Sequence, residues 1–78
     1  MKIVLDGRKM TDREAAHTYL QEVFGFPAHY GRNLDALCDC LTEGEIPEIE
    51  MTHEGEMLAA LGKYGERLLQ VFADVQEK

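Results

Sequence analysis

Two aspartates four residues apart, Asp35 and Asp39, are the side chains whose spacing first raises the question of chemistry in this sequence. They lie in the stretch YGRNLDALCDCLTEGE, residues 30–45, which otherwise has the pattern of an amphipathic helix. Like charges at this spacing repel on a helix surface, at a cost of roughly 0.2–0.5 kcal/mol. Asp35 falls in the first turn, where the helix dipole favours a carboxylate, but Asp39 lies too deep to gain much. Helix formation alone therefore does not explain Asp39.

The cysteines of the same stretch could act as nucleophiles. Cys38 could use His29 or His17 as its base, but it falls on the apolar side of its helix, where a free cysteine packs as a small hydrophobic residue. Cys40 lies towards the other side and has no cation next to it in the sequence that would lower its thiol pKa. The pattern therefore favours structural thiols.

The aspartate pair could instead bind a hard cation or work as acid and base. The sequence lacks the glycine and terminal glutamate of a calcium loop. Two carboxyl pKa values are split by burial or by a cleft, and an exposed helix face provides neither. We therefore expect no catalytic residue, no cofactor and no dedicated metal site.

A row of carboxylates on a rigid helix can also serve as a recognition surface. Such a row can mimic the phosphates of a nucleic-acid strand and occupy a cationic pocket that is built to hold them. Hydrogen bonds from Arg or Lys to a carboxylate are of the strong, charge-assisted kind. Thr42 completes the exposed edge on which Asp35 and Asp39 lie. Binding would relieve the repulsion between the aspartates, so this interpretation accounts for Asp39.

Length and composition predict one small acidic domain. The 78 residues are near the lower size at which a single core supports a fold. With 15 acidic and 8 basic residues, the net charge of −7 argues against direct binding of nucleic acid and permits a cationic partner. No apolar run reaches the length of a membrane span, and the first residues lack a signal-peptide core, so we expect a cytoplasmic protein without membrane contact.

Two short strands are predicted, one on each side of the acidic helix in the sequence. The first is the β-branched run at residues 2–5, which the turn dipeptide Asp6-Gly7 closes. The second is the alternating segment around residues 48–51, whose start Pro47 marks. Because the crossover between them is long, the strands should be parallel and the connection right-handed. The order of elements predicts an α/β fold, with a small parallel sheet packed against three to four helices.

Apolar residues at helical spacing predict the helices. Residues 11–14, TDRE, match a capping box for the first helix, and Gly25 ends it. Asn33 is the expected N-cap of the helix that carries the aspartates. A short third helix ends at Gly62, and Gly65 precedes the last one. The expected core residues on these helices are Leu20, Phe24, Leu34, Leu37, Leu41, Leu68 and Phe72.

The segment YGRNLDALCDCLT, residues 30–42, resembles the motif by which the barstar family of ribonuclease inhibitors is recognised. LQVF, residues 69–72, looks like the core of that family's last helix, and the similarity covers residues 1–78 as a single domain. The resemblance implies a barstar-like fold with a small three-stranded parallel sheet. It also implies a function, which is to block the active site of a basic, barnase-type ribonuclease with the second helix and the preceding loop.

Site residues follow from the resemblance position by position. It implies that Asp39 is the central anchor in the partner's cationic pocket and that Asp35 is its neighbour one turn back. Thr42 would add a polar contact, and Gly31 and Asn33 would shape the loop and donate backbone contacts. The resemblance also implies two further partner-binding residues, His29 and Asp74. Asp74 stands where the family has a glutamate.

The sequence departs from the family pattern in its aromatic residues and near its C-terminus. The family often has Tyr at the position of His29, Trp at that of Cys38, and another Trp where this chain has residues 43–45, EGE. Aromatic residues are usual interface anchors, so their absence bears on the identity of the partner and on the affinity. The family's terminal strand would follow the last helix. We therefore expect either a shortened chain or a sheet completed by another copy, in a homodimer or strand-swapped oligomer.

Two other classes of function stay open at this point. The first is a barstar-like regulatory or structural interaction domain without a nuclease partner, since a fold does not guarantee a function. The second is a small enzyme that uses Cys40 or the aspartates, which no spacing in the sequence favours.

Overall fold

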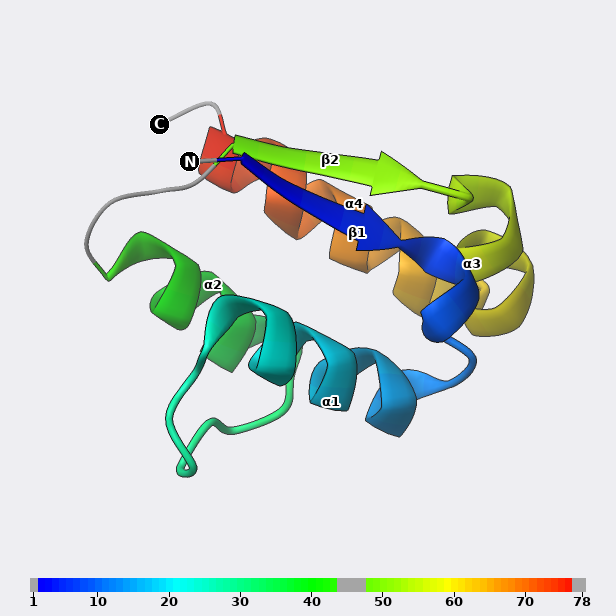
Figure 1. The fold of residues 1–78 in the computed structure, drawn as a ribbon. Coiled ribbons are helices and arrows are strands. Elements are labelled where there is room, and N and C mark those ends of the chain that lie inside the picture. The colour runs from blue at the N-terminus through cyan, green and yellow to red at the C-terminus, as the bar shows by residue number, and fades with distance from the viewer. Residues whose placement is uncertain (1, 44–47, 77–78) are drawn as a thin grey trace.

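Two parallel strands, β1 (Lys2–Asp6) and β2 (Glu48–Thr52), lie side by side along one side of the molecule (Figure 1). The computed structural model describes residues 2–43 and 48–76 of the chain. Lys2 pairs with Glu48 and Asp6 with Thr52, which confirms the predicted parallel pairing. Pro47, the predicted start of the second strand, lies outside the described residues.

Side-chain alternation divides this sheet into an inner and an outer face. Leu5 is fully buried and pairs with Met51 on the inner face. The neighbouring pair, Val4 and Glu50, points the other way: Val4 is 51% exposed, and Glu50 Oε1 lies 3.2 Å from Lys2 Nζ. The helices therefore cover one face of the sheet and leave the other to solvent.

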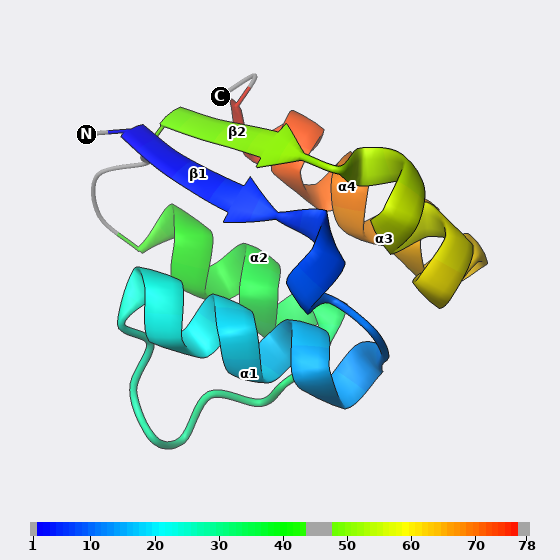
Figure 2. The same ribbon diagram turned by 45° about the vertical axis from the view of Figure 1, so that its right-hand side comes forward.

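Within residues 2–43 and 48–76, the chain forms four helices and one 3-10 turn (Figure 2). The elements are η1 (Gly7–Lys9), α1 (Arg13–Phe24), α2 (Leu34–Thr42), α3 (Glu54–Leu61) and α4 (Lys63–Gln76). Helix α2 packs against α4, and α3 packs against both α4 and the 3-10 turn. None of the helices within the described ranges has the length and apolar character that crossing a membrane requires.

Capping residues set the helix ends, with one shift from the sequence prediction. Gly25 ends α1 in the left-handed region (φ 70°), and Asn33 caps α2, as predicted. The N-cap of α1 is Asp12 and not Thr11, because the Asp12 carboxylate accepts a hydrogen bond of 2.8 Å from the Ala15 N–H. A carboxylate there also interacts favourably with the helix dipole, which a hydroxyl does not.

The predicted role of Gly65 was wrong. The last helix begins at Lys63, so Gly65 lies in its first turn and does not precede it. A Cβ at Gly65 would lie 2.9 Å from Met57 Sδ and 3.2 Å from Leu61 Cβ, which is closer than side chains normally approach. The close contact between α3 and α4 therefore favours glycine at this position.

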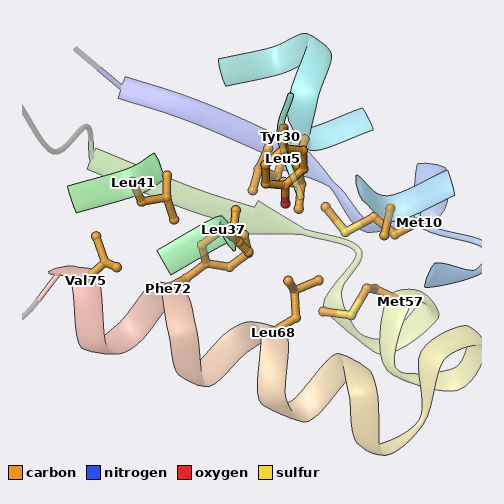
Figure 3. Packing of buried hydrophobic residues seen from close by; sticks show 11 residues of the cluster. Leu5, Met10, Tyr30, Leu37, Leu41, Met57, Leu68, Phe72 and Val75 are labelled. Carbon is orange, nitrogen blue, oxygen red and sulfur yellow. The ribbon is translucent and has the colours of Figure 1, made fainter. Parts of the chain in front are cut away.

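The hydrophobic core lies between the inner face of the sheet and the helices (Figure 3). In Figure 3, Leu41 of α2 lies opposite Val75 of α4, and Leu37 lies next to Phe72. All four side chains are buried, and Leu37 is fully so. This contact orients α2 and determines which of its sides reaches solvent.

Most of the predicted core residues are buried, and two lie at the edge of the core. Leu34 is partly buried because it sits in the first turn of α2 beside a surface groove. Phe24 is partly buried at the end of α1, where its ring stacks on Phe26 at 5.3 Å between centroids. The predicted residues that are buried are Leu20, Leu37, Leu41, Leu68 and Phe72.

Residues 2–43 and 48–76 contain two strands, so a third strand of the kind that the resemblance implies is not among them. The homodimer or strand-swapped oligomer stays a prediction, which the native mass of the protein in solution tests.

Replacement of Leu37 by Ala should lower the free energy of unfolding by about 2–5 kcal/mol, because it leaves a cavity between α2 and α4. The measurement is urea unfolding followed by circular dichroism. Leu34→Ala is the matched control and should cost clearly less, because Leu34 is only partly buried. Equal losses for both variants would contradict the orientation of α2.

Candidate functional site

Helix α2 buries Leu37 and Leu41 and turns its two aspartates to solvent. Asp35 and Asp39 are both exposed, and their spacing puts them on one side of the helix. Within the described part of the chain, neither carboxylate has an ion pair or a side-chain hydrogen bond. Their negative charges are therefore left for solvent or for a binding partner.

Thr42 lies in the last turn of the same helix and is exposed. Its hydroxyl donates to the backbone carbonyls of Cys38, at 2.9 Å, and Asp39, at 3.1 Å. Because the single hydroxyl proton is used within the helix, the oxygen has only lone pairs to offer. Thr42 can therefore accept a hydrogen bond from a cationic donor, as the aspartates can.

The loop before α2 is held close to the first turn of the helix. Asn33 Oδ1 accepts from the Ala36 N–H at 2.7 Å, and Asn33 Nδ2 donates to the Gly31 carbonyl at 3.3 Å. A Cβ at Gly31 would lie 3.0 Å from the Ala36 Cβ, so the close approach favours glycine. Arg32 between them has a left-handed backbone (φ 54°), which is strained for a residue with a side chain.

Two side chains fasten this loop to α1, and the sequence analysis had missed both. Tyr30 is only 5% exposed, and its hydroxyl lies 2.7 Å from Nδ1 of His17. Arg32 donates through Nη2 to the Glu14 carbonyl at 3.2 Å and to the hydroxyl of Thr18. These contacts set the position of the loop relative to α1, and they maintain the strained backbone of Arg32.

His17 is the centre of a buried polar network. Its Nε2 lies 2.5 Å from the hydroxyl of Tyr64 at the start of α4, while Tyr30 occupies Nδ1. A neutral imidazole has one donor and one acceptor nitrogen, so one tyrosine hydroxyl donates and the other accepts. Burial, and then the charge of Arg32, lowers the pKa of His17, which keeps it neutral. Burial also raises the pKa of both tyrosines.

Helical spacing could have revealed that His17 is buried, because it precedes Leu20 and Phe24 by three and seven positions on the same helix face. With both ring nitrogens occupied, His17 is not free to act as a base for Cys38.

A groove of about 550 Å³ opens beside the N-terminal end of α2. In it, the Arg13 guanidinium lies over the ring of Tyr64, at 4.4 Å from the centroid. Asn33 and Asp35 belong both to this groove and to the loop and helix edge described above. The groove is lined by Arg13, Glu14, His17, Arg32, Asn33, Leu34, Asp35 and Tyr64.

The other two predicted site residues come from neighbouring elements. His29 is exposed in the loop between α1 and α2. Asp74 is exposed on α4 and accepts a hydrogen bond of 2.8 Å from Gln70 Nε2. Val75, next to Asp74 in the chain, lies opposite Leu41 in Figure 3.

The environment of Cys40 opposes nucleophilic chemistry. Burial raises the pKa of the Cys40 thiol, and the negative charges of Glu43 and Asp39 raise it further. Its thiolate form is therefore scarce near neutral pH. Across residues 2–43 and 48–76, no three His, Cys, Asp or Glu side chains gather as metal ligands would. What the site offers is charge and hydrogen-bond acceptors on a rigid helix.

The fold and the exposed edge define a small α/β domain with an acidic helix as its candidate recognition element. The chain belongs to the barstar family, because the family model described as "Barstar (barnase inhibitor)" matches residues 1–78. A Bacillus subtilis (strain 168) protein named "Putative ribonuclease inhibitor YrdF" is 39% identical over 79 aligned residues, which cover 99% of this chain and 87% of that protein. These matches confirm the resemblance found in the sequence, and the family they indicate is one of inhibitors.

Acid should destabilise the protein through His17. Because the folded-state pKa of His17 lies below the ordinary value of 6.5, the unfolded chain binds the proton more readily. The free energy of unfolding should therefore fall as the pH drops below about 6.5, by at most about 1.4 kcal/mol per pH unit for one proton. Urea unfolding across this pH range measures the effect.

Two variants test the assignment to this side chain. His17→Gln keeps hydrogen-bonding groups but does not titrate, so its stability should depend less on pH than that of the wild type. His29→Gln removes an exposed histidine and should keep the wild-type dependence. The assignment is wrong if the two variants show the same pH profile.

Proposed function

We propose that this protein inhibits a barnase-type ribonuclease by placing the exposed edge of α2 in the active site of the enzyme. The observation that carries the proposal is that Asp35 and Asp39 are exposed, and unpaired within the described residues, on a helix that the core holds in place. The cations with which a ribonuclease binds RNA phosphates would donate to these carboxylates instead. Membership of the barstar family and the name of the Bacillus subtilis relative support this role.

Each residue of the edge has a defined role in the proposal. Asp39 is the central anchor and accepts several charge-assisted hydrogen bonds. Asp35 binds a cation one turn earlier, and Thr42 accepts from a donor at the other end. Gly31 and Asn33 bring the loop backbone close to the enzyme. His29 and Asp74 contact it from the two sides of the helix.

The free protein is ready to bind in this way. Among residues 2–43 and 48–76, no ion pair of Asp35 or Asp39 must be broken, and the backbone that carries both is already helical. The repulsion between the two carboxylates, roughly 0.2–0.5 kcal/mol, is relieved when cations of the enzyme lie between them. Such preorganisation lowers the entropic cost of association.

The partner in this proposal is basic, and the inhibitor acts in the cytoplasm of the cell that makes it. With Cys38 partly buried where the family often has Trp, this surface has less aromatic area to offer. Recognition therefore relies more on charge than in relatives that have the tryptophan.

Replacement of Asp39 by Ala should abolish inhibition of barnase while the helix content stays unchanged. The expected loss is at least about 2 kcal/mol of binding free energy, as for interface hot spots in general, of which barstar's own key aspartate is a standard example. Inhibition constants from RNA cleavage assays measure it. Glu22→Ala, which removes an exposed carboxylate from α1, is the control and should inhibit like the wild type. A folded Asp39→Ala variant that inhibits fully would defeat the proposal.

The rate of association with barnase should fall steeply as salt is added, while the dissociation rate changes little. The net charge of −7 attracts a basic enzyme over a long range, and salt screens this attraction. Stopped-flow measurements over a series of salt concentrations test the prediction. An association rate that is independent of salt would remove electrostatic steering from the mechanism.

A further inference from the structure

We infer that the partner bound by the α2 edge also presents an acidic side chain, which binds between Arg13 and Arg32 in the groove at the N-terminal end of α2. The inference rests on the proposed function, since one partner contacts both surfaces. It adds a site for a carboxylate to a surface whose other charged residues attract cations.

Arg13 and Arg32 are cations without an anionic partner in the described part of the chain. Glu14 and Asp35 line the same groove, yet neither carboxylate forms an ion pair with either guanidinium. The protein has only 8 basic residues against 15 acidic ones, so intramolecular acids are plentiful. Two unpaired guanidiniums in one groove therefore indicate a site for an external anion.

Both guanidiniums are held in position. Arg13 stacks on the ring of Tyr64, and the Tyr64 hydroxyl is bound to the buried His17. Arg32 is anchored through Nη2 to the Glu14 carbonyl and to Thr18. The N–H groups of Arg13, and those on Nε and Nη1 of Arg32, have no hydrogen-bond acceptor within the described part of the chain. A guanidinium that is already ordered loses little entropy when it binds a carboxylate.

The charges around the groove favour a single carboxylate over a phosphate. Glu14 and Asp35 at its rim would repel a doubly charged anion, whereas one negative charge is balanced by two guanidiniums. Asp35 and Asn33 are shared between the groove and the α2 edge, so a protein seated on the edge reaches the groove directly. A protein side chain, Asp or Glu, is the occupant that fits both observations.

The partner must then match a pattern of two opposite charges. Its cations meet Asp35 and Asp39, and its acidic side chain meets Arg13 and Arg32. A basic nuclease without this acid would leave both guanidiniums desolvated and unpaired, which costs affinity. The groove therefore helps to select among basic ribonucleases, a task that net charge alone cannot perform.

Two arginine-to-glutamine variants of equal charge test the inference, with barnase as the probe. Arg13→Gln should raise the Kd about 10- to 100-fold, the effect of losing hydrogen bonds to a charged group. Arg67 is exposed on α4 and does not line the groove, so Arg67→Gln is the matched control. Long-range attraction to a basic enzyme predicts that losing either cation tightens binding slightly. Weaker binding of Arg13→Gln, in contrast to this slight tightening, therefore requires a local contact between Arg13 and an acid of barnase.

The outcomes separate this inference from the proposed function. If Asp39→Ala abolishes inhibition while Arg13→Gln and Arg67→Gln have the same effect, the groove assignment is wrong and the proposed function stands. If the wild type does not inhibit barnase, both fail. Arg13 is exposed, so its variant should melt like the wild type, and a thermal scan checks this.

Two further measurements identify the anion. A double-mutant cycle, in which each Asp and Glu of barnase is neutralised in turn, should find one acid that couples to Arg13→Gln. No coupled acid at any position would overturn the inference. Saturable binding of inorganic phosphate to the free protein, lost in Arg13→Gln, would also overturn the assignment to a protein carboxylate.

Discussion

The contact between α2 and α4 is the interaction on which the rest of the structure depends. Leu37 and Leu41 pack against Phe72 and Val75, and this burial fixes the rotation of α2 about its own axis. A helix that presents its leucines to the core must present the positions between them to solvent. The aspartates are therefore exposed because Leu37 and Leu41 are buried, and the core fixes the side of α2 from which they project. Stability and recognition are in this way two consequences of one packing arrangement.

The loop before α2 is held by buried hydrogen bonds, whereas α2 itself is held by hydrophobic packing. Tyr30, His17 and Tyr64 form a buried hydrogen-bonded chain that joins the loop to α1 and α4. No buried side-chain nitrogen or oxygen within the described residues is left without a hydrogen-bond partner. These three side chains are therefore buried without the energetic cost of an unsatisfied polar group. The hydrogen-bonded chain also supports the strained backbone of Arg32 and the position of the Tyr64 ring beneath Arg13. One buried histidine thus contacts both the loop residue Tyr30 and the groove residue Tyr64.

Charge is distributed over this surface in two parts. Within the described residues, Asp35 and Asp39 on the helix edge form no ion pair, and Arg13 and Arg32 in the adjoining groove form none with the acids that line it. The arrangement offers a physical substitute for aromatic anchors, because fixed charges of both signs can specify a partner where little aromatic area is available.

Residues that act locally were readable from the sequence. The leucine spacing of α2, its Asn33 cap and the pair Asp35 and Asp39 all follow from helix periodicity and from hydrogen bonding within one turn, and the family motif lies in this same segment. Tertiary structure alone decided the features that depend on segments meeting in space. Gly65 lies inside α4 at the point where α3 approaches closely. The convergence of α1, the loop and α4 buries His17 between two tyrosines and brings Arg13 and Arg32 into one groove. Periodicity indicates which side of a helix or strand is apolar, but it does not indicate which other element will pack against that side. The contacts of Gly65, His17, Arg13 and Arg32 depend on which elements pack together, so only the tertiary structure shows them.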